Sequence, residues 1–187
     1  MKHFSCTKTN IKLFGMTIQQ NYNALLLLNE LIVSNPQIVN IIELGTARGG
    51  LSVFFGLCMQ CRGGKVTTFD ITNFYNDIPY AKHFESLGID YFQKDALHKD
   101  TKKLIKGIIT HAPKTKGNLL FCDNGNKPEE LKYYYKIMRK GDFLLVHDYG
   151  DEIKDKDLPK DLFKFYIKYK QDLFDKHRSL ILCLRKK

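Results

Sequence analysis

The chain has 187 residues, of which 43% are hydrophobic and 27% are charged. This length fits one domain, and the composition is that of a soluble globular protein and excludes an intrinsically disordered one. The net charge of +10 comes almost wholly from lysines spread along the chain. They either form a basic face for phosphate-bearing partners or simply coat the surface. The second interpretation is favoured, because no tight cluster of basic residues interleaved with aromatics stands out.

The five cysteines lie mostly in apolar segments, as reduced thiols of a cytoplasmic protein do. Cys58 and Cys61 form a CxxC, but no second pair completes a zinc site, so a core role is favoured over metal or redox chemistry. The longest apolar run, residues 24–28, is too short to span a bilayer. The first residues show no signal-peptide core. We therefore expect a cytoplasmic protein without membrane association.

Hydrophobic periodicity predicts helices and strands that alternate along the chain. In chain order these are helix 21–34, strand 39–44, helix 51–61, strand 65–70, helix 80–87, strand 89–93, helix 99–110, strand 118–122, helix 129–138, strand 143–146, helix 158–169 and strand 179–184. Short, wholly apolar strands that alternate with helices predict an α/β fold, a parallel sheet covered by helices on both faces. The charged loop 149–159 follows a strand end, where such folds cover their substrates.

The stretch IIELGTARGG, residues 41–50, joins an apolar strand to a glycine-containing loop. Its glycines would let the backbone approach a ligand closely at the carboxyl end of the strand. The spacing of Gly45 and Gly49 is not the dinucleotide fingerprint GxGxxG, and no phosphate-binding loop is present. Glu43, expected to point into the crevice, would suit a ligand with an ammonium or hydroxyl groups.

ELGTARGGLS resembles the first motif of class I S-adenosylmethionine-dependent methyltransferases. The likeness continues in order through FDI, QKDAL, LLFCDNGNKPEEL and GDFLLVHDYGD, the last two resembling the O-methyltransferase branch that includes catechol-type, macrolide-sugar and cephalosporin-hydroxylase-like enzymes. The resemblance implies a Rossmann-like, doubly wound, mostly parallel seven-stranded sheet. It also implies S-adenosylmethionine as cofactor. The implied cofactor-binding residues are Glu43, Gly45, Thr46, Gly49, Ser52, Asp70, Ile71, Asp95, Ala96 and Asp123.

In the resembled branch, acids at the ends of the fourth and fifth strands hold a divalent cation such as Mg²⁺ or Mn²⁺. The resemblance places Asp123, His147 and Asp148 at this metal site, with Asp123 and His147 as catalytic residues. His147 departs from the usual acid or amide. It is interpreted as a ligand for manganese or zinc, as the general base, or as a structural residue. Asn126 stands where some relatives carry a basic histidine.

These patterns predict an enzyme that transfers a methyl group from S-adenosylmethionine to a hydroxyl of a small molecule such as a sugar. A nucleic-acid methyltransferase, an enzyme that cleaves the cofactor and a non-catalytic binding protein are the alternatives. Residues 1–38 are expected to form an N-terminal helical or lid segment, and residues 39–187 the methyltransferase domain of one compact unit. A homodimer is a reasonable expectation for this fold.

Overall fold

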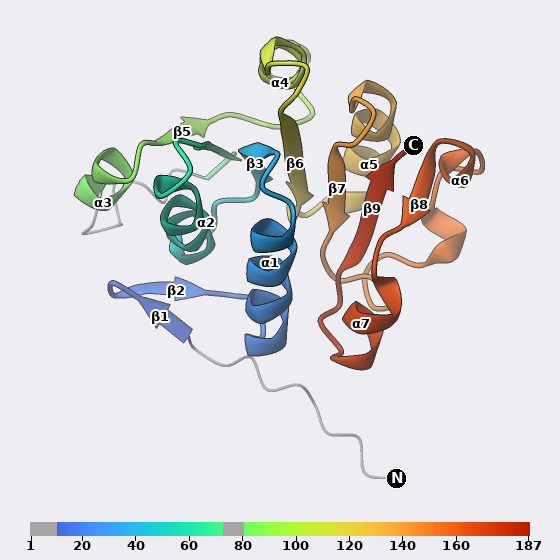
Figure 1. The fold of residues 1–187 in the computed structure, drawn as a ribbon, viewed down its shortest axis with the longest axis horizontal. Coiled ribbons are helices and arrows are strands. Elements are labelled where there is room, and N and C mark those ends of the chain that lie inside the picture. Colours follow the sequence, from blue (N-terminus) through green and yellow to red (C-terminus); the bar gives the residue numbers. More distant parts are fainter. Residues whose placement is uncertain (1–10, 73–80) are drawn as a thin grey trace, which may run out of the picture.

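The computed structural model describes residues 11–72 and 81–187. Its main sheet has seven strands in the order β5-β4-β3-β6-β7-β9-β8, which Figure 1 shows from one edge to the other. Six of the strands run in the same direction, whereas β9 is antiparallel to both of its neighbours, β7 and β8. The strands are β3 (Ile38–Leu44), β4 (Lys65–Asp70), β5 (Ile89–Gln93), β6 (Gly117–Cys122), β7 (Phe143–Val146), β8 (Tyr166–Lys168) and β9 (Leu182–Lys186). The predicted doubly wound, mostly parallel α/β sheet is confirmed.

Helices cover both faces of this sheet because most of its strands are apolar on both sides. Ile41 of β3 belongs to one core cluster and Ile42 to the other. The first cluster includes residues of α1, α2, α3 and α7, and the second residues of α4, α5 and α6. The helices are α1 (Tyr22–Ser34), α2 (Gly50–Gln60), α3 (Ala81–Ser86), α4 (Lys99–His111), α5 (Lys127–Ile137), α6 (Leu162–Phe165) and α7 (Gln171–Lys176).

An N-terminal hairpin of β1 (Ile11–Leu13) and β2 (Met16–Ile18) precedes α1 and packs beside α2 (Figure 1). The sequence pattern does not predict this hairpin, because each strand has only three residues. Its turn depends on Phe14 and Gly15, both of which have positive φ. Met16 and Ile18 are buried in the same core as α1 and α2. The hairpin is therefore anchored to the body of the domain.

The prediction of one helix over residues 158–169 is wrong. The structure has a 3-10 turn, η2 (Asp155–Asp157), then the short α6 and the edge strand β8. Tyr166 ends the helix because its side chain is buried and its hydroxyl donates to the carbonyl of Tyr135 at 2.6 Å. The last strand also begins later than predicted, because Arg178 and Leu180 adopt positive φ. Position 80, the predicted start of the third helix, lies outside the described residues.

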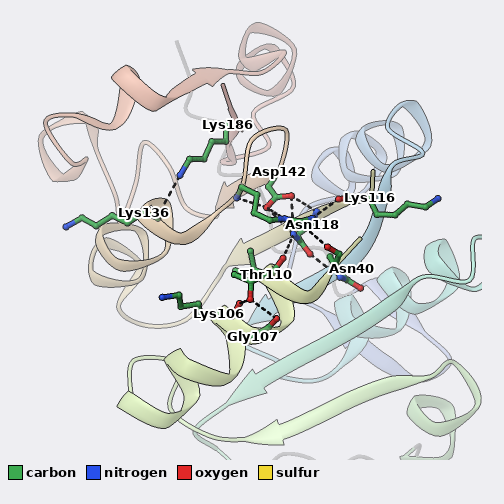
Figure 2. A network of polar contacts seen from close by, with 12 residues as sticks. Asn40, Lys106, Gly107, Thr110, Lys116, Asn118, Lys136, Asp142 and Lys186 are labelled. Atoms are coloured by element: carbon green, nitrogen blue, oxygen red, sulfur yellow. Dashed lines mark hydrogen bonds and ion pairs between the residues drawn. The ribbon is translucent and has the colours of Figure 1, made fainter. Parts of the chain in front are cut away.

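A buried polar network fixes the amino ends of the central strands (Figure 2). Asp142, 1% exposed, accepts hydrogen bonds from the backbone and side-chain amides of Asn118 and from the backbone amide of Arg139. Asn40 donates to the side chain of Asn118 at 3.0 Å. The network ties β3, β6 and the start of β7 together. It thereby sets the alignment of the opposite strand ends, where the candidate site lies.

Among the described residues, no helix combines the length and the apolar character needed to cross a membrane.

Candidate active site

The candidate site lies at the carboxyl ends of β3, β6 and β7. Cys122 of β6 pairs with Val146 of β7, so the next residues, Asp123 and His147, leave adjacent strands side by side. The ladder continues past the strands, because the backbone amide of His147 donates to the carbonyl of Cys122 at 3.0 Å and that of Asp123 to Leu44 at 2.9 Å. The parallel register therefore brings together residues that are 24 positions apart in the sequence.

Asp123, His147 and Asp148 form a compact group of possible metal ligands. One ligand atom from each lies within 4.8 Å of the others. The Nδ1 atom of His147 is 2.9 Å from Oδ1 of Asp123 and 3.3 Å from Oδ2 of Asp148. Asp148 turns back toward His147 through a positive φ of 57°, a conformation that aspartate adopts more readily than most residues. The structure thus brings together all three residues that the sequence assigned to a metal site.

Charge interactions within this group shift its pKa values. Burial lowers the pKa of His147, but the hydrogen bonds and charges of Asp123 and Asp148 outweigh it and raise that pKa to about 9. Burial raises the pKa of Asp148, yet His147 and Lys127 outweigh it and lower that pKa to about 2. Near neutral pH the group is therefore an imidazolium held between carboxylates.

Lys127 was not among the residues expected at the site, and its ammonium is a second cation in the group. It is the first residue of α5, 5% exposed. Its Nζ lies 3.0 Å from Oδ2 of Asp148, 2.8 Å from Oε2 of Glu152 and 3.8 Å from Oδ1 of Asp123. Lysine at this helix end opposes the helix dipole, so the acidic neighbours hold it there. The spacing of four residues from Asp123, and of four from Asp148 to Glu152, was the signal available in the sequence.

A cavity of about 380 Å³ opens over this group. Asp123, Lys127, His147 and Asp148 line it, and so does Ala47 of the glycine-containing loop. Gln19 and Asn21 contribute from the segment between β2 and α1, and Asp151 and Glu152 from the charged loop after β7. The cavity therefore joins the loop after β3 to the group at the ends of β6 and β7.

The glycines of the loop are required mainly by contacts within the chain. Gly45 has a φ of 106°, and a Cβ there would lie 2.6 Å from the carbonyl oxygen of Asp123. A Cβ on Gly50 would lie 2.5 Å from the carbonyl oxygen of Thr17 in β2. Gly49 caps α2 with a φ of 75°. At Gly45 and Gly50 an added side chain would thus collide with the chain's own backbone, whether or not a ligand is bound.

The expectation that Glu43 points into the crevice is wrong. Its side chain is fully buried and accepts a hydrogen bond from Ser52, which is also fully buried on α2. Burial raises the pKa of Glu43 to about 8, in spite of the hydroxyl groups of Ser52 and Thr68. Glu43 therefore lies beneath the loop as a neutral acid near neutral pH, and not at the cavity surface.

The other predicted cofactor residues lie at the ends of β3, β4 and β5. Asp70 is 6% exposed and accepts hydrogen bonds from the backbone amides of Ala47 and Thr72, at 2.9 and 2.8 Å. Ile71, immediately after it, is 63% exposed. Thr46 is buried, with its hydroxyl 2.7 Å from that of Thr68. Asp70 thus couples the end of β4 to the loop after β3.

Asp95 and Ala96 follow β5 and have different environments. Asp95 is exposed and accepts a hydrogen bond from the backbone amide of Leu97 at 2.8 Å. Ala96 is fully buried, and its carbonyl accepts from the hydroxyl of Tyr134 at 2.6 Å. Of this pair, Asp95 is the one whose side chain is accessible to a ligand.

Gln20 brings the N-terminal segment onto the site. Its side-chain amide donates to Oδ2 of Asp123, although the two residues are 103 positions apart. Gln20 is 2% exposed and follows the hairpin directly. No periodicity or motif in the sequence could indicate this contact, because only the packing of the hairpin on α2 creates it.

The family model described as rhamnosyl O-methyltransferase/CmcI matches residues 6–164. The chain belongs to this family. The prediction that the chain is an S-adenosylmethionine-dependent O-methyltransferase is confirmed. A search of curated proteins finds no match to the chain.

Solved structures of CmcI have the fold of this family member. One, with S-adenosylhomocysteine, aligns with all of this chain and 84% of its own at a TM-score of 0.68 and 15% identity. Another, with Mg and S-adenosylmethionine, aligns with 95% of this chain and 76% of its own at a TM-score of 0.63 and 15% identity. At this identity the likeness establishes the fold, and the roles of single residues rest on the geometry.

Proposed function

We propose that this O-methyltransferase acts on a hydroxyl of a small molecule such as a sugar, with the acceptor bound in the cavity over Asp123, His147 and Asp148. The observation that carries this proposal is the position of the cavity. It lies between the loop after β3 and a group of oxygen and imidazole ligands. A donor bound along the loop and a hydroxyl beside the carboxylates would thus face each other.

For the donor, S-adenosylmethionine, we propose a site along the ends of β3, β4 and β5. Gly45, Thr46 and Gly49 form the loop, with Glu43 and Ser52 supporting it from below. Asp70 and Asp95 would meet the ribose and the adenine, and the exposed Ile71 would pack on the adenine, next to the backbone at Ala96. Residues 11–38 would act as a lid, for which the contact between Gln20 and Asp123 is the support. The first ten residues of the predicted lid segment 1–38 lie outside the described residues.

The ligand group fits a small divalent cation. Two carboxylates and an imidazole converge, and the Lys127 ammonium already lies between the carboxylates as a stand-in cation. Asp123, Asp148 and His147 would hold the ion, with His147 favouring manganese over magnesium. When bound, such an ion supplies a Lewis acid that lowers the pKa of the acceptor hydroxyl.

The chain's own residues can orient the acceptor and take its proton. The role of base is an alternative to that of ligand. When Asp123 and Asp148 alone hold the ion, Asp123 accepts at the Nδ1 side of His147, and Nε2 is the ring nitrogen able to take a proton from the hydroxyl. With a pKa of about 9, His147 is protonated near neutral pH. A positively charged donor beside it would disfavour that form and release the base.

The test of this proposal is calorimetric titration with S-adenosylhomocysteine, in Mn²⁺ and again in EDTA. We expect the wild type to bind, and Ile71→Ala to weaken binding about tenfold, because an exposed isoleucine becomes buried against the ligand. Ile167→Ala is the matched control, since Ile167 is also an exposed isoleucine but lies on the edge strand β8. Absence of binding by the wild type in every condition would contradict the proposal, and equal affinities of the two variants would contradict the assigned donor site.

A further inference from the structure

The most unusual group at the site is the buried ammonium of Lys127. Its side chain is 7% exposed, and three carboxylates from three segments surround it. Asp123 follows β6, Asp148 follows β7, and Glu152 belongs to the loop beyond. A lysine that served only to support the fold would not need to share the carboxylate oxygens that a metal ion would use.

The distances rank the three partners. Glu152 and Asp148 are direct ion-pair partners at 2.8 and 3.0 Å, whereas Asp123 is more distant at 3.8 Å. Glu152 is also the most exposed, at 61% against 21% for Asp148. The Lys127 ammonium is therefore bound on one side by a metal-ligand candidate and on the other by a carboxylate at the surface.

We infer that Lys127 is a resident cation of this site, beside His147, and that it competes with a divalent ion for Asp123 and Asp148 and moves onto Glu152 when the ion binds. The inference rests on the metal part of the proposed function. A small divalent cation binds carboxylate oxygens at about 2.0–2.2 Å. Lys127 and the ion cannot both share Oδ2 of Asp148 without strong repulsion between like charges at short distance.

Glu152 makes this exchange possible. It already accepts a hydrogen bond from Lys127, so the ammonium keeps one partner when it leaves Asp148. Because Glu152 is largely exposed and lies in the loop after β7, it can follow the lysine outward. Lys127 thus lowers the affinity for the metal, and Glu152 limits that loss.

The experiment measures Mn²⁺ binding, by calorimetry and by the electron paramagnetic resonance signal of free Mn²⁺. We expect Lys127→Met to raise the affinity at least about tenfold, because it removes a competing charge. Lys132→Met is the matched control, since Lys132 lies on the same helix, pairs with Glu129 and is 52% exposed. It makes the same change in net charge and should alter the affinity less than about twofold. Lys127→Arg keeps the charge and should retain the wild-type affinity.

A second pair of variants tests the role of Glu152. Glu152→Gln should weaken Mn²⁺ binding more than Asp151→Asn, which removes the same charge from the neighbouring position of the cavity wall. Adding Asp123→Asn to Lys127→Met should abolish the gain in Mn²⁺ affinity, which would show that the ion binds at Asp123. Circular dichroism checks that each variant folds. If Lys127→Met does not fold, Lys127→Gln, which keeps a donor, takes its place.

Lys127→Met that binds Mn²⁺ no more tightly than Lys132→Met would overturn the inference. Weaker binding would also overturn it, since Lys127 would then organise the ligands. Titration of the same samples with S-adenosylhomocysteine in EDTA distinguishes failure of this inference from failure of the proposed function. Binding of that ligand without a gain in Mn²⁺ affinity leaves the proposed donor site intact, whereas its failure to bind contradicts the proposed function itself.

Discussion

At the scale of single residues, the buried acid Glu43 shows how the loop after β3 is stabilised. Glu43 lies near the end of β3, where an acid could face a ligand, but its side chain is fully buried and does not reach the surface of the cavity. Its Oε2 accepts from Ser52, and its Oε1 has no hydrogen-bond partner among the described residues. A carboxyl group in this environment is more stable neutral than charged, which makes the stability of the fold depend on pH.

Glu43→Gln should reduce that dependence. The pKa of Glu43 is about 8 in the folded chain and near its ordinary value of 4.5 in the unfolded one, so the folded state binds the proton more tightly. The stabilisation is complete below about pH 4.5 and is lost as the pH rises through 8. Urea unfolding between pH 5 and 8 should show the free energy of unfolding falling less steeply for the variant, by up to about 1.4 kcal/mol per pH unit.

Glu130 provides the comparison for this measurement. Burial also raises its pKa to about 8, so the wild type and Glu43→Gln both retain a slope from Glu130. Combining Glu43→Gln with Glu130→Gln should flatten the profile further than either change alone. Identical slopes for the wild type and Glu43→Gln would mean that Glu43 is charged in the folded protein.

At the scale of elements, the close approach of the hairpin to α2 determines what covers the loop. Gly50 is the first residue of α2, and the backbone of Thr17 in β2 lies against it. This contact places the segment after β2 over the strand ends, where Gln20 reaches Asp123. The hairpin is short and has few contacts of its own, so its position depends on this packing.

Gly50→Ala should loosen the hairpin. The added Cβ would lie 2.5 Å from the carbonyl oxygen of Thr17, which must then move. We expect a loss of about 1–3 kcal/mol in the free energy of unfolding and faster amide exchange in β1 and β2. Gly107→Ala is the control, because in the middle of α4 its Cβ would meet only the ring of His111 at 3.9 Å. It should stabilise the protein by up to about 1 kcal/mol, and unchanged exchange in the Gly50 variant would contradict the packing argument.

At the scale of the whole molecule, the net charge of +10 contrasts with the acidic site. The lysines are distributed along the chain, whereas the cavity lining has more carboxylates than cations. Its carboxylates are Asp123, Asp148, Asp151 and Glu152, and its cations are Lys127 and His147. A cavity of this charge suits a cationic donor and a metal ion better than a phosphate backbone. This charge supports the proposed small-molecule acceptor over the nucleic-acid alternative.

A short single-stranded RNA should bind through non-specific charge alone. We expect its affinity to fall at least about tenfold between roughly 50 and 200 mM salt in fluorescence anisotropy, with DNA of the same length behaving alike. Incubation with methyl-labelled donor should leave the RNA unlabelled. Salt-resistant binding to one sequence, or a labelled nucleic acid, would instead support a nucleic-acid methyltransferase.

The alternation of strands and helices, and the positions of Asp123, His147 and Asp148 at strand ends, can be predicted from the sequence alone. These features depend on local periodicity and on the rule that parallel strands end at one edge of a sheet. The sequence also contained the motif order by which the family was identified. The family model matches residues 6–164, a range that contains these motifs from ELGTARGGLS to GDFLLVHDYGD.

The surroundings of those residues depend instead on how distant segments pack together. The burial of Glu43, the ion pairs of Lys127 and the contact of Gln20 with Asp123 all join segments whose approach depends on side-chain packing. The division of residues 158–169 into α6 and β8 has the same origin, since pairing with β9 and burial of Tyr166 outweigh the helical spacing of the aromatics. Local pattern fixes where an element can form, but long-range burial and charge fix which groups it meets.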